Sequence, residues 1–217
     1  MEELIADPFR AARLVLRLRQ EGVTDDGVLR AMEIIDRGAF VDDPALKELA
    51  FADCVLPIPC GQIIPRPVAT GQLLQALDLG PAREARILLI GMGSGYTAAL
   101  AGRLAADVFA VERYDRLTDL ARQRIVRLGL DNLAVRHSDG FLGWAERGPY
   151  DRILMTGQVD EVPQELFDQL RSGGLVIAPM QHEGRQHIAR MAANGSTEWL
   201  GLTHTLPPLV AGCSRAL

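Results

Sequence analysis

Short apolar runs alternate with longer amphipathic segments through the middle of the sequence. The apolar runs span 87–90, 107–112, 133–136 and 150–156, and the amphipathic segments between the first three span 97–104 and 113–128. The runs have the length of buried strands, and the longer segments have the spacing of helices. Strands that alternate with helices predict an α/β fold built on a doubly wound, mostly parallel sheet.

The two ends of the sequence show other patterns. From residue 9 to about residue 50, apolar residues recur at helical spacing, which predicts an N-terminal helical preface whose second helix Asp25 or Asp26 could cap. The proline-rich segment 51–67 is expected to be an ordered loop over the ligand edge of the sheet, before a helix at 68–78. Strands are predicted at 175–179, 187–192 and 199–203, the last two as an antiparallel C-terminal hairpin.

The turn after the first predicted strand is the most informative feature of the chain. It reads Gly91-Met92-Gly93-Ser94-Gly95-Tyr96 and leads directly into a predicted helix. Glycines permit positive φ angles and leave no Cβ to block a ligand, while the N–H groups at the start of the helix can bind a nucleotide-like molecule. Tyr96 stands where the dinucleotide fingerprint G-x-G-x-x-G has its third glycine, which disfavours an NAD-dependent dehydrogenase.

Polar residues stand at the ends of the other predicted strands. Glu112 ends the second strand and precedes Arg113, Ser138-Asp139-Gly140 follows the third, and Thr156 ends the fourth. In a Rossmann-like, doubly wound sheet the ligand binds outside the carboxyl ends of the strands. We expect Glu112, at a solvent-facing strand end, to accept hydrogen bonds from two ribose hydroxyls, and Asp139 to accept one from an adenine amino group.

Composition narrows the class of protein. The 217 residues are 48% hydrophobic and 24% charged, as in a folded globular protein. The formal net charge of −5 gives no overall attraction to nucleic acid or to an anionic membrane, and no apolar run approaches the roughly 20 residues that span a bilayer. The three cysteines form no C-x-x-C pair, so we expect no metal site, and their odd number without a secretory leader favours a cytoplasmic protein.

Together the motifs resemble those of S-adenosylmethionine-dependent methyltransferases. More narrowly, the chain is similar to the protein-L-isoaspartate O-methyltransferases, because Leu56-Pro57-Ile58-Pro59-Cys60-Gly61-Gln62 matches a Leu-Pro-Ile…Gly-Gln segment that precedes the glycine turn in that family. Further matches are Gly143-Trp144, Glu161-Val162-Pro163 and Pro208-Leu209-Val210. The resemblance implies one methyltransferase domain over 1–217, with the helical preface and substrate loop in 1–80 and the cofactor-binding sheet in 81–217.

The resemblance also implies a cofactor, a substrate and two sets of site residues. S-adenosylmethionine would bind at Gly91, Met92, Gly93, Ser94, Gly95, Tyr96, Glu112, Arg113, Ser138, Asp139, Gly140 and Thr156. A damaged protein or peptide carrying isoaspartate would enter a channel between Gln62, Ile63 and Ile64 on one wall and Pro208, Leu209 and Val210 on the other. Neither the motifs nor the composition indicates an oligomeric state.

One segment departs from the family pattern. The family has Thr-Ile-Ser where this chain has Ile63-Ile64-Pro65, and the resemblance implies that the serine hydroxyl lies beside the methyl-transfer centre. Proline has neither a side-chain donor nor a backbone N–H, so residue 65 cannot make that hydrogen bond. We therefore predict weak isoaspartyl methylation, with two alternatives: a methyltransferase for another acceptor, or a module that binds S-adenosylmethionine without catalysis.

The acceptor's chemistry bears on this choice. A carboxylate, with a reference pKa of about 4, is ionised at neutral pH and needs no general base, whereas an amine or a phenol must lose a proton. The four histidines, His137, His182, His187 and His204, fall on different predicted elements, so none is a positioned base. This pattern favours a carboxylate acceptor.

Overall fold

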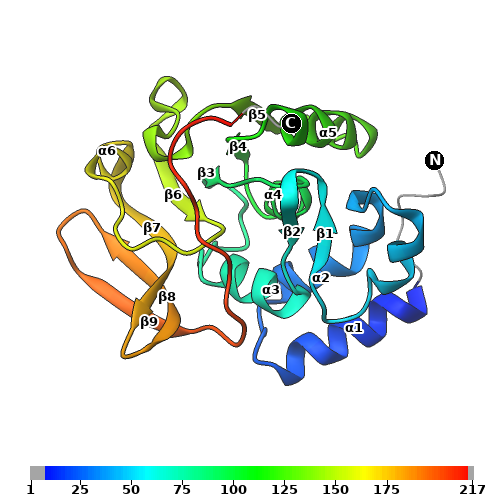
Figure 1. Cartoon of the computed structure of the whole chain (residues 1–217). Coiled ribbons are helices and arrows are strands. Elements are labelled where there is room, and N and C mark those ends of the chain that lie inside the picture. The colour runs from blue at the N-terminus through cyan, green and yellow to red at the C-terminus, as the bar shows by residue number, and fades with distance from the viewer. Residues whose placement is uncertain (1–7, 215–217) are drawn as a thin grey trace.

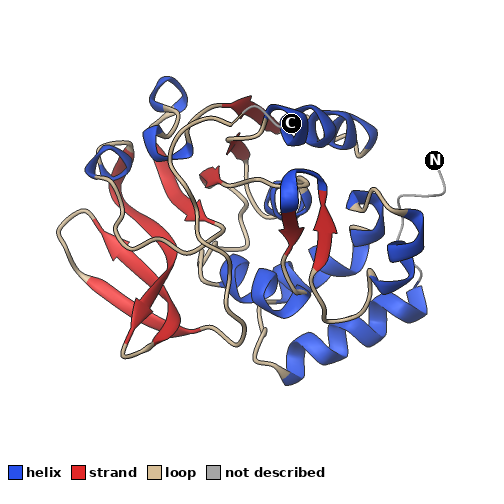
Figure 2. Cartoon of the chain, viewed as in Figure 1, coloured by secondary structure: helices blue, strands red, loops and turns tan. Residues whose placement is uncertain are grey.

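A seven-stranded sheet with the order β5-β4-β3-β6-β7-β8-β9 forms the centre of the molecule (Figures 1 and 2). The computed structural model describes residues 8–214. The strands are β3 (Arg86–Ile90), β4 (Asp107–Glu112), β5 (Leu133–His137), β6 (Tyr150–Met155), β7 (Leu170–His182), β8 (Arg185–Ala192) and β9 (Thr197–Gly201). The five strands β5, β4, β3, β6 and β7 are parallel, while β8 runs antiparallel to β7 and β9 runs antiparallel to β8. This arrangement confirms the predicted α/β class and the C-terminal hairpin.

Helices cover both faces of the sheet. They are α1 (Pro8–Gln20), α2 (Asp26–Ile34), α3 (Pro67–Gln75), α4 (Tyr96–Gly102), α5 (Asp115–Arg127) and α6 (Gln164–Phe167). Side chains alternate across β3: Ile87 and Leu89 pack in the larger core with α1 to α5, while Leu88 and Ile90 pack in a second core that includes Leu166 of α6. A strand buried on both faces reads as a continuous apolar run, which is why β3 was predictable.

The N-terminal preface is helical, as predicted. Helices α1, α2 and α3 contribute to the larger core. Asp25 caps α2, because its Oδ1 accepts a hydrogen bond from the Val28 N–H at 2.8 Å. Short 3-10 turns then follow at Arg37–Phe40 and Pro44–Leu49.

The prediction of a loop over 51–67 is wrong in one respect, because this segment contains a small hairpin. Strands β1 (Leu56–Ile58) and β2 (Gln62–Ile64) pair antiparallel, with Leu56 opposite Ile64. Cys60, with φ 63°, and Gly61, with φ 64°, turn the chain between them. Strands of three residues are too short to show a period of two, so the prolines dominated the pattern.

No helix in residues 8–214 is long and apolar enough to cross a membrane. The cytoplasmic location and the absence of a nucleic-acid partner stay predictions.

Candidate functional site

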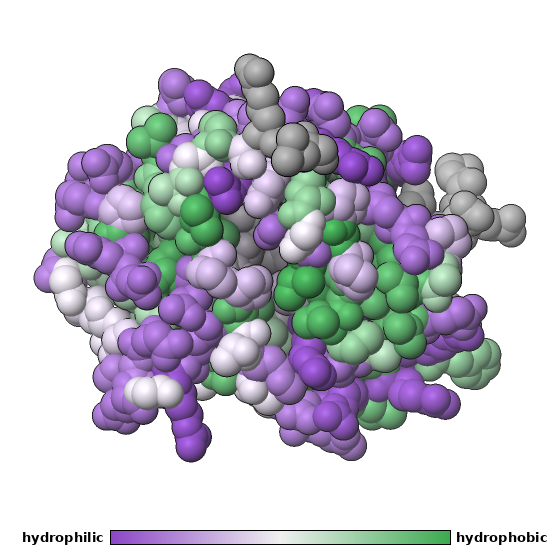
Figure 3. Space-filling model, in the orientation of Figure 1, coloured by the Kyte–Doolittle hydropathy of each residue, from purple (hydrophilic) through white to green (hydrophobic). Residues whose placement is uncertain are grey.

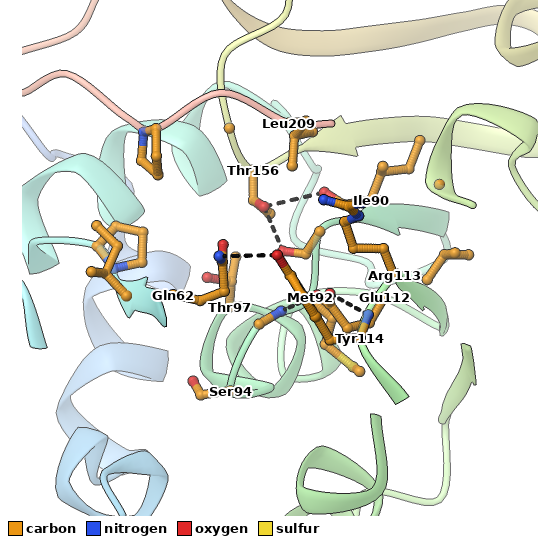
Figure 4. Close-up of a pocket in the computed structure, with 18 of the residues that line it drawn as sticks. Gln62, Ile90, Met92, Ser94, Thr97, Glu112, Arg113, Tyr114, Thr156 and Leu209 are labelled. Atoms are coloured by element: carbon orange, nitrogen blue, oxygen red, sulfur yellow. Dashed lines mark hydrogen bonds between the residues drawn. The ribbon is translucent and has the colours of Figure 1, made fainter. Parts of the chain in front are cut away.

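A pocket opens at the carboxyl edge of the parallel strands, between the β1–β2 hairpin and the end of the chain (Figure 4). Fifteen of the residues proposed from the sequence line it: Gly91, Met92, Gly93, Ser94, Tyr96, Glu112, Arg113, Gly140, Thr156, Gln62, Ile63, Ile64, Pro208, Leu209 and Val210. Pro65 lines it as well. The structure therefore brings the two proposed channel walls and the glycine turn to one cavity.

The three glycines of the turn differ in what they contact. All have positive φ, at 85° for Gly91, 56° for Gly93 and 91° for Gly95. A Cβ on Gly91 would lie 2.7 Å from Leu209 Cδ2 and from Thr156 Oγ1, and one on Gly95 would lie 3.0 Å from Ala121 Cβ. A Cβ on Gly93 would meet only Ile58 Cδ1, at 3.7 Å. Gly91 and Gly95 are therefore required by protein packing, whereas Gly93 leaves space open in the pocket.

Glu112 is buried, with 4% of its surface exposed, so the prediction of a solvent-facing strand end is wrong. Its Oε2 accepts a hydrogen bond from the Gly93 N–H at 2.7 Å, and its Oε1 accepts one from the Tyr114 N–H at 3.0 Å. Burial raises the pKa of the Glu112 carboxyl, and these backbone hydrogen bonds oppose the rise. Each oxygen keeps a lone pair, so the carboxylate can still accept from two ligand hydroxyls.

Asp139, Ser138 and Gly95 do not line the pocket. Both carboxylate oxygens of Asp139 already have backbone partners, because Oδ1 accepts from the Phe141 N–H at 3.0 Å and Oδ2 from the Gly212 N–H at 2.8 Å. The bond to the Phe141 N–H is a local cap, of the kind that Asp side chains form at the start of a helical segment. In this structure Asp139 holds two backbone N–H groups, and its expected contact with an adenine amino group stays a prediction.

Residues 207–214, here called the C-terminal strap, cross the carboxyl edge of the sheet (Figure 1). At one end of the strap, the Gln158 N–H donates to Pro207 O at 2.9 Å and the Leu209 N–H donates to Gln158 O at 2.8 Å. At the other end, the Gly212 N–H binds Asp139, and the Ser214 N–H donates to Arg113 O at 2.7 Å. The strap is thus fixed on both sides of the pocket, and Leu209 packs between Gly91 and Gly157.

The wall opposite the strap, here called the acceptor wall, consists of residues 62–65. A buried arginine that the sequence did not indicate holds this wall in place. Arg37 is 1% exposed, and its guanidinium donates to the backbone carbonyls of Ala50, Ala52, Cys54, Ile64 and Pro65 at 2.7–3.5 Å. Burial lowers the pKa of Arg37. Five carbonyls of one segment thus surround a cation, which fixes the β1–β2 hairpin and the residues beside it.

Other lining residues were also missed. Thr97 and Phe141 belong to the pocket, as does Tyr114, which follows the acidic end of β4 by two residues. The position of Tyr114 after a strand end was a usable signal, whereas Arg37 stands in a segment without any motif. In the described part of the chain, no group of His, Cys, Asp and Glu side chains could hold a metal ion.

The sheet topology, the glycine turn and the buried acid at the end of β4 define a Rossmann-like methyltransferase. Comparison with known proteins agrees: residues 10–205 match the family described as protein-L-isoaspartate(D-aspartate) O-methyltransferase. The chain belongs to this family, and so it is an S-adenosylmethionine-dependent O-methyltransferase. The family acts on protein substrates that carry isoaspartate, and a dehydrogenase is no longer a candidate.

Individual relatives support the assignment over nearly the whole chain. The protein-L-isoaspartate O-methyltransferase of Maricaulis maris is 40% identical over 215 residues, which cover 98% of this chain and 99% of the relative. That of Xanthobacter autotrophicus is 44% identical over 206 residues, covering 94% of this chain and 93% of the relative.

Solved structures share the fold. A protein-L-isoaspartate O-methyltransferase matches with a TM-score of 0.79 at 27% identity, over 93% of this chain and 67% of that one. A putative protein-L-isoaspartate O-methyltransferase from Plasmodium falciparum, in complex with S-adenosyl-L-homocysteine, matches with a TM-score of 0.76 at 22% identity, over 93% of this chain and 98% of that one.

Proposed function

We propose that the pocket binds S-adenosylmethionine between the glycine turn and Glu112, and that it methylates the α-carboxylate of isoaspartate in a protein or peptide. A buried hydrogen-bond acceptor and an open space support this assignment. The buried Glu112 carboxylate has lone pairs free for a ribose diol, and the space above Gly93 is not filled by any side chain closer than Ile58 at 3.7 Å. A nucleoside cofactor fits both features.

The chemistry of methyl transfer suits a carboxylate acceptor. When bound, S-adenosylmethionine supplies a methyl group on a positively charged sulfur, and transfer to a carboxylate oxygen gives a methyl ester and a neutral thioether without moving a proton. The chain then has to orient the acceptor and exclude water. Ile63, Ile64, Pro65, Pro208, Leu209 and Val210 line the pocket, and these six apolar side chains suit the exclusion of water.

The surface beside the channel supports a protein substrate. Figure 3 shows apolar side chains gathered near β1 and β2, next to a hollow in this face of the molecule. Leu49, at 45% exposure, and Val55, at 47%, belong to the segment that leads into the hairpin. Exposed apolar side chains at the mouth of a pocket mark a contact surface for the residues that flank the modified site.

The convergence of the β1–β2 hairpin, the glycine turn and the C-terminal strap on one cavity is the observation that carries this proposal. Purified protein should transfer labelled methyl groups from S-adenosylmethionine to a peptide containing one isoaspartate. A peptide of the same sequence with ordinary aspartate is the control and should remain unlabelled. Cofactor binding without any labelling of the isoaspartyl peptide would favour another acceptor or a non-catalytic role.

A further inference from the structure

Most side chains of the acceptor channel carry no hydrogen-bond donor, and the Gln62 amide already donates to Cys60 O at 3.2 Å and to the Tyr114 hydroxyl at 3.5 Å. Residues 63–65 and 208–210 have apolar side chains. The Thr156 hydroxyl donates to the carbonyls of Ile90 and Gly91, and the Ser94 hydroxyl, which accepts from the Tyr96 N–H at 3.3 Å, belongs to the glycine turn on the cofactor side. The Tyr96 hydroxyl is fully buried and has no partner among the described residues. A charged carboxylate that enters this channel needs a donor from elsewhere, because an unpaired buried charge is costly.

Tyr114 places a hydroxyl at this point. Figure 4 shows its side chain reaching across the pocket from the end of β4, with its oxygen meeting the amide of Gln62. The Gln62 Nε2 donates to the Tyr114 Oη at 3.5 Å, which is a long contact, and no group in residues 8–214 is found to accept the phenol proton. The hydroxyl therefore faces the acceptor wall with its donor unused.

The base of the Tyr114 side chain is held firmly. Its backbone N–H donates to Glu112 Oε1 at 3.0 Å, and its carbonyl accepts from the Thr118 hydroxyl at 3.1 Å. The Arg113 guanidinium lies 5.2 Å from the centre of its ring, within the range of a cation–π contact. Tyr114 also pairs with Ser214 of the strap. The ring is thus positioned by the same elements that build the cofactor side of the pocket.

We propose that the Tyr114 hydroxyl donates a hydrogen bond to the acceptor carboxylate and so makes Tyr114 a substrate-binding residue of the active site. This inference rests on the proposed function. The donor holds one carboxylate oxygen while the other faces the methyl group, and no proton is transferred. Gln62 orients the phenol through its amide and leaves the phenol proton free for the substrate.

Calorimetry on the protein saturated with S-adenosylhomocysteine tests this role without turnover. Tyr114→Phe keeps the ring and removes only the oxygen, so the isoaspartyl peptide should bind about 10- to 100-fold more weakly, with a matching rise in KM. The affinity for S-adenosylhomocysteine should change by no more than about twofold. A peptide with β-alanine in place of isoaspartate has the same backbone but lacks the α-carboxylate, so it should bind the wild type and Tyr114→Phe equally.

Two further variants make the result specific. Tyr150→Phe removes a phenol hydroxyl that donates to Trp144 O at 2.6 Å in the second core, so it should leave peptide binding unchanged. Thr97→Val removes the hydroxyl of Thr97, which also lines the pocket, from α4. A loss of peptide affinity in this variant and not in Tyr114→Phe would overturn the proposal.

The failure of this inference and the failure of the proposed function look different. If the wild type methylates the isoaspartyl peptide and Tyr114→Phe binds it equally well, only the role of Tyr114 is wrong. If the wild type binds S-adenosylhomocysteine but not the peptide, the isoaspartyl acceptor is wrong, and the role of Tyr114 falls with it.

Discussion

The Arg37 guanidinium donates a hydrogen bond of 2.9 Å from Nη2 to the carbonyl oxygen of Pro65, and the same nitrogen donates to Cys54 O at 2.7 Å. Cys54 precedes the β1–β2 hairpin and Pro65 follows it, so one nitrogen joins the two ends of the hairpin. The second nitrogen, Nη1, donates to the carbonyls of Ala50 and Ala52, and a lysine with its single nitrogen cannot reproduce both sets of hydrogen bonds. The acceptor wall therefore depends on a residue that does not line the pocket.

Replacing Arg37 should loosen this wall. Arg37→Met leaves several buried carbonyls without a donor, which should lower the free energy of unfolding by about 2–5 kcal/mol. Urea denaturation measures this loss, and limited proteolysis should then cut within residues 50–65 first. Arg37→Lys should lie between the wild type and Arg37→Met. Equal stability of all three proteins would contradict the role assigned to these hydrogen bonds.

Gly93→Val should abolish cofactor binding. Valine is strained at a φ of 56°, and its side chain would occupy the space left open above the turn. We expect at least a hundredfold loss of affinity for S-adenosylhomocysteine by calorimetry. Gly129→Val is the matched control, because Gly129 has a φ of 61° and no neighbour within 4 Å of its Cβ position, outside the pocket. It should have a similar strain and unchanged affinity.

Glu112 should make cofactor binding depend on pH. Burial raises its pKa from the ordinary value of 4.5, so in the free protein the carboxyl begins to ionise at a higher pH than in the unfolded chain. The folded form then binds more protons, and the stability of the free protein falls as pH rises from 4.5 through the raised pKa. Ribose hydroxyls donate to the ionised form, so the affinity for S-adenosylhomocysteine should rise over the same window.

Glu112→Gln separates these effects. The amide cannot ionise, and its nitrogen cannot accept from a backbone N–H or a ribose hydroxyl, so affinity should fall by about 10- to 100-fold and lose its pH dependence. Thermal shifts with and without cofactor between about pH 5 and about pH 8 measure both quantities. A cofactor-induced shift in the variant that matches the wild type would remove Glu112 from the binding site.

Residues 65 and 114 should be coupled. If Tyr114 supplies the donor that Pro65 cannot, Pro65→Ser should restore much of the activity lost in Tyr114→Phe and add less to the wild type. Ile63→Thr with Pro65→Ser recreates the family's Thr-Ile-Ser and should raise isoaspartyl activity furthest in the Tyr114→Phe background. A double-mutant cycle on kcat/KM measures this coupling, and strictly additive effects would contradict it.

The sequence predicted those parts of the fold and site that depend on one short segment. Strand β3 was visible because both faces of it are buried, and the glycine turn because ligand approach and tight packing restrict residue choice there. Asp139 was assigned to adenine because a strand end and an acid suggest a ligand; the pattern could not show that Gly212 would take one of its oxygens. Arg37 acts only through carbonyls, which every residue has, so no sequence pattern marks its partners.

The C-terminal strap sets the order in which the pocket can be completed. The hairpin, the glycine turn and Glu112 are made before residue 207, and a chain that emerges from the ribosome from its N-terminus can assemble them first. Leu209 and the bonds of Gly212 and Ser214 arrive after every strand of the sheet. A nascent chain therefore has the β1–β2 hairpin and the cofactor wall before it has residues 207–214, and the pocket can be enclosed only after residue 214 has left the ribosome.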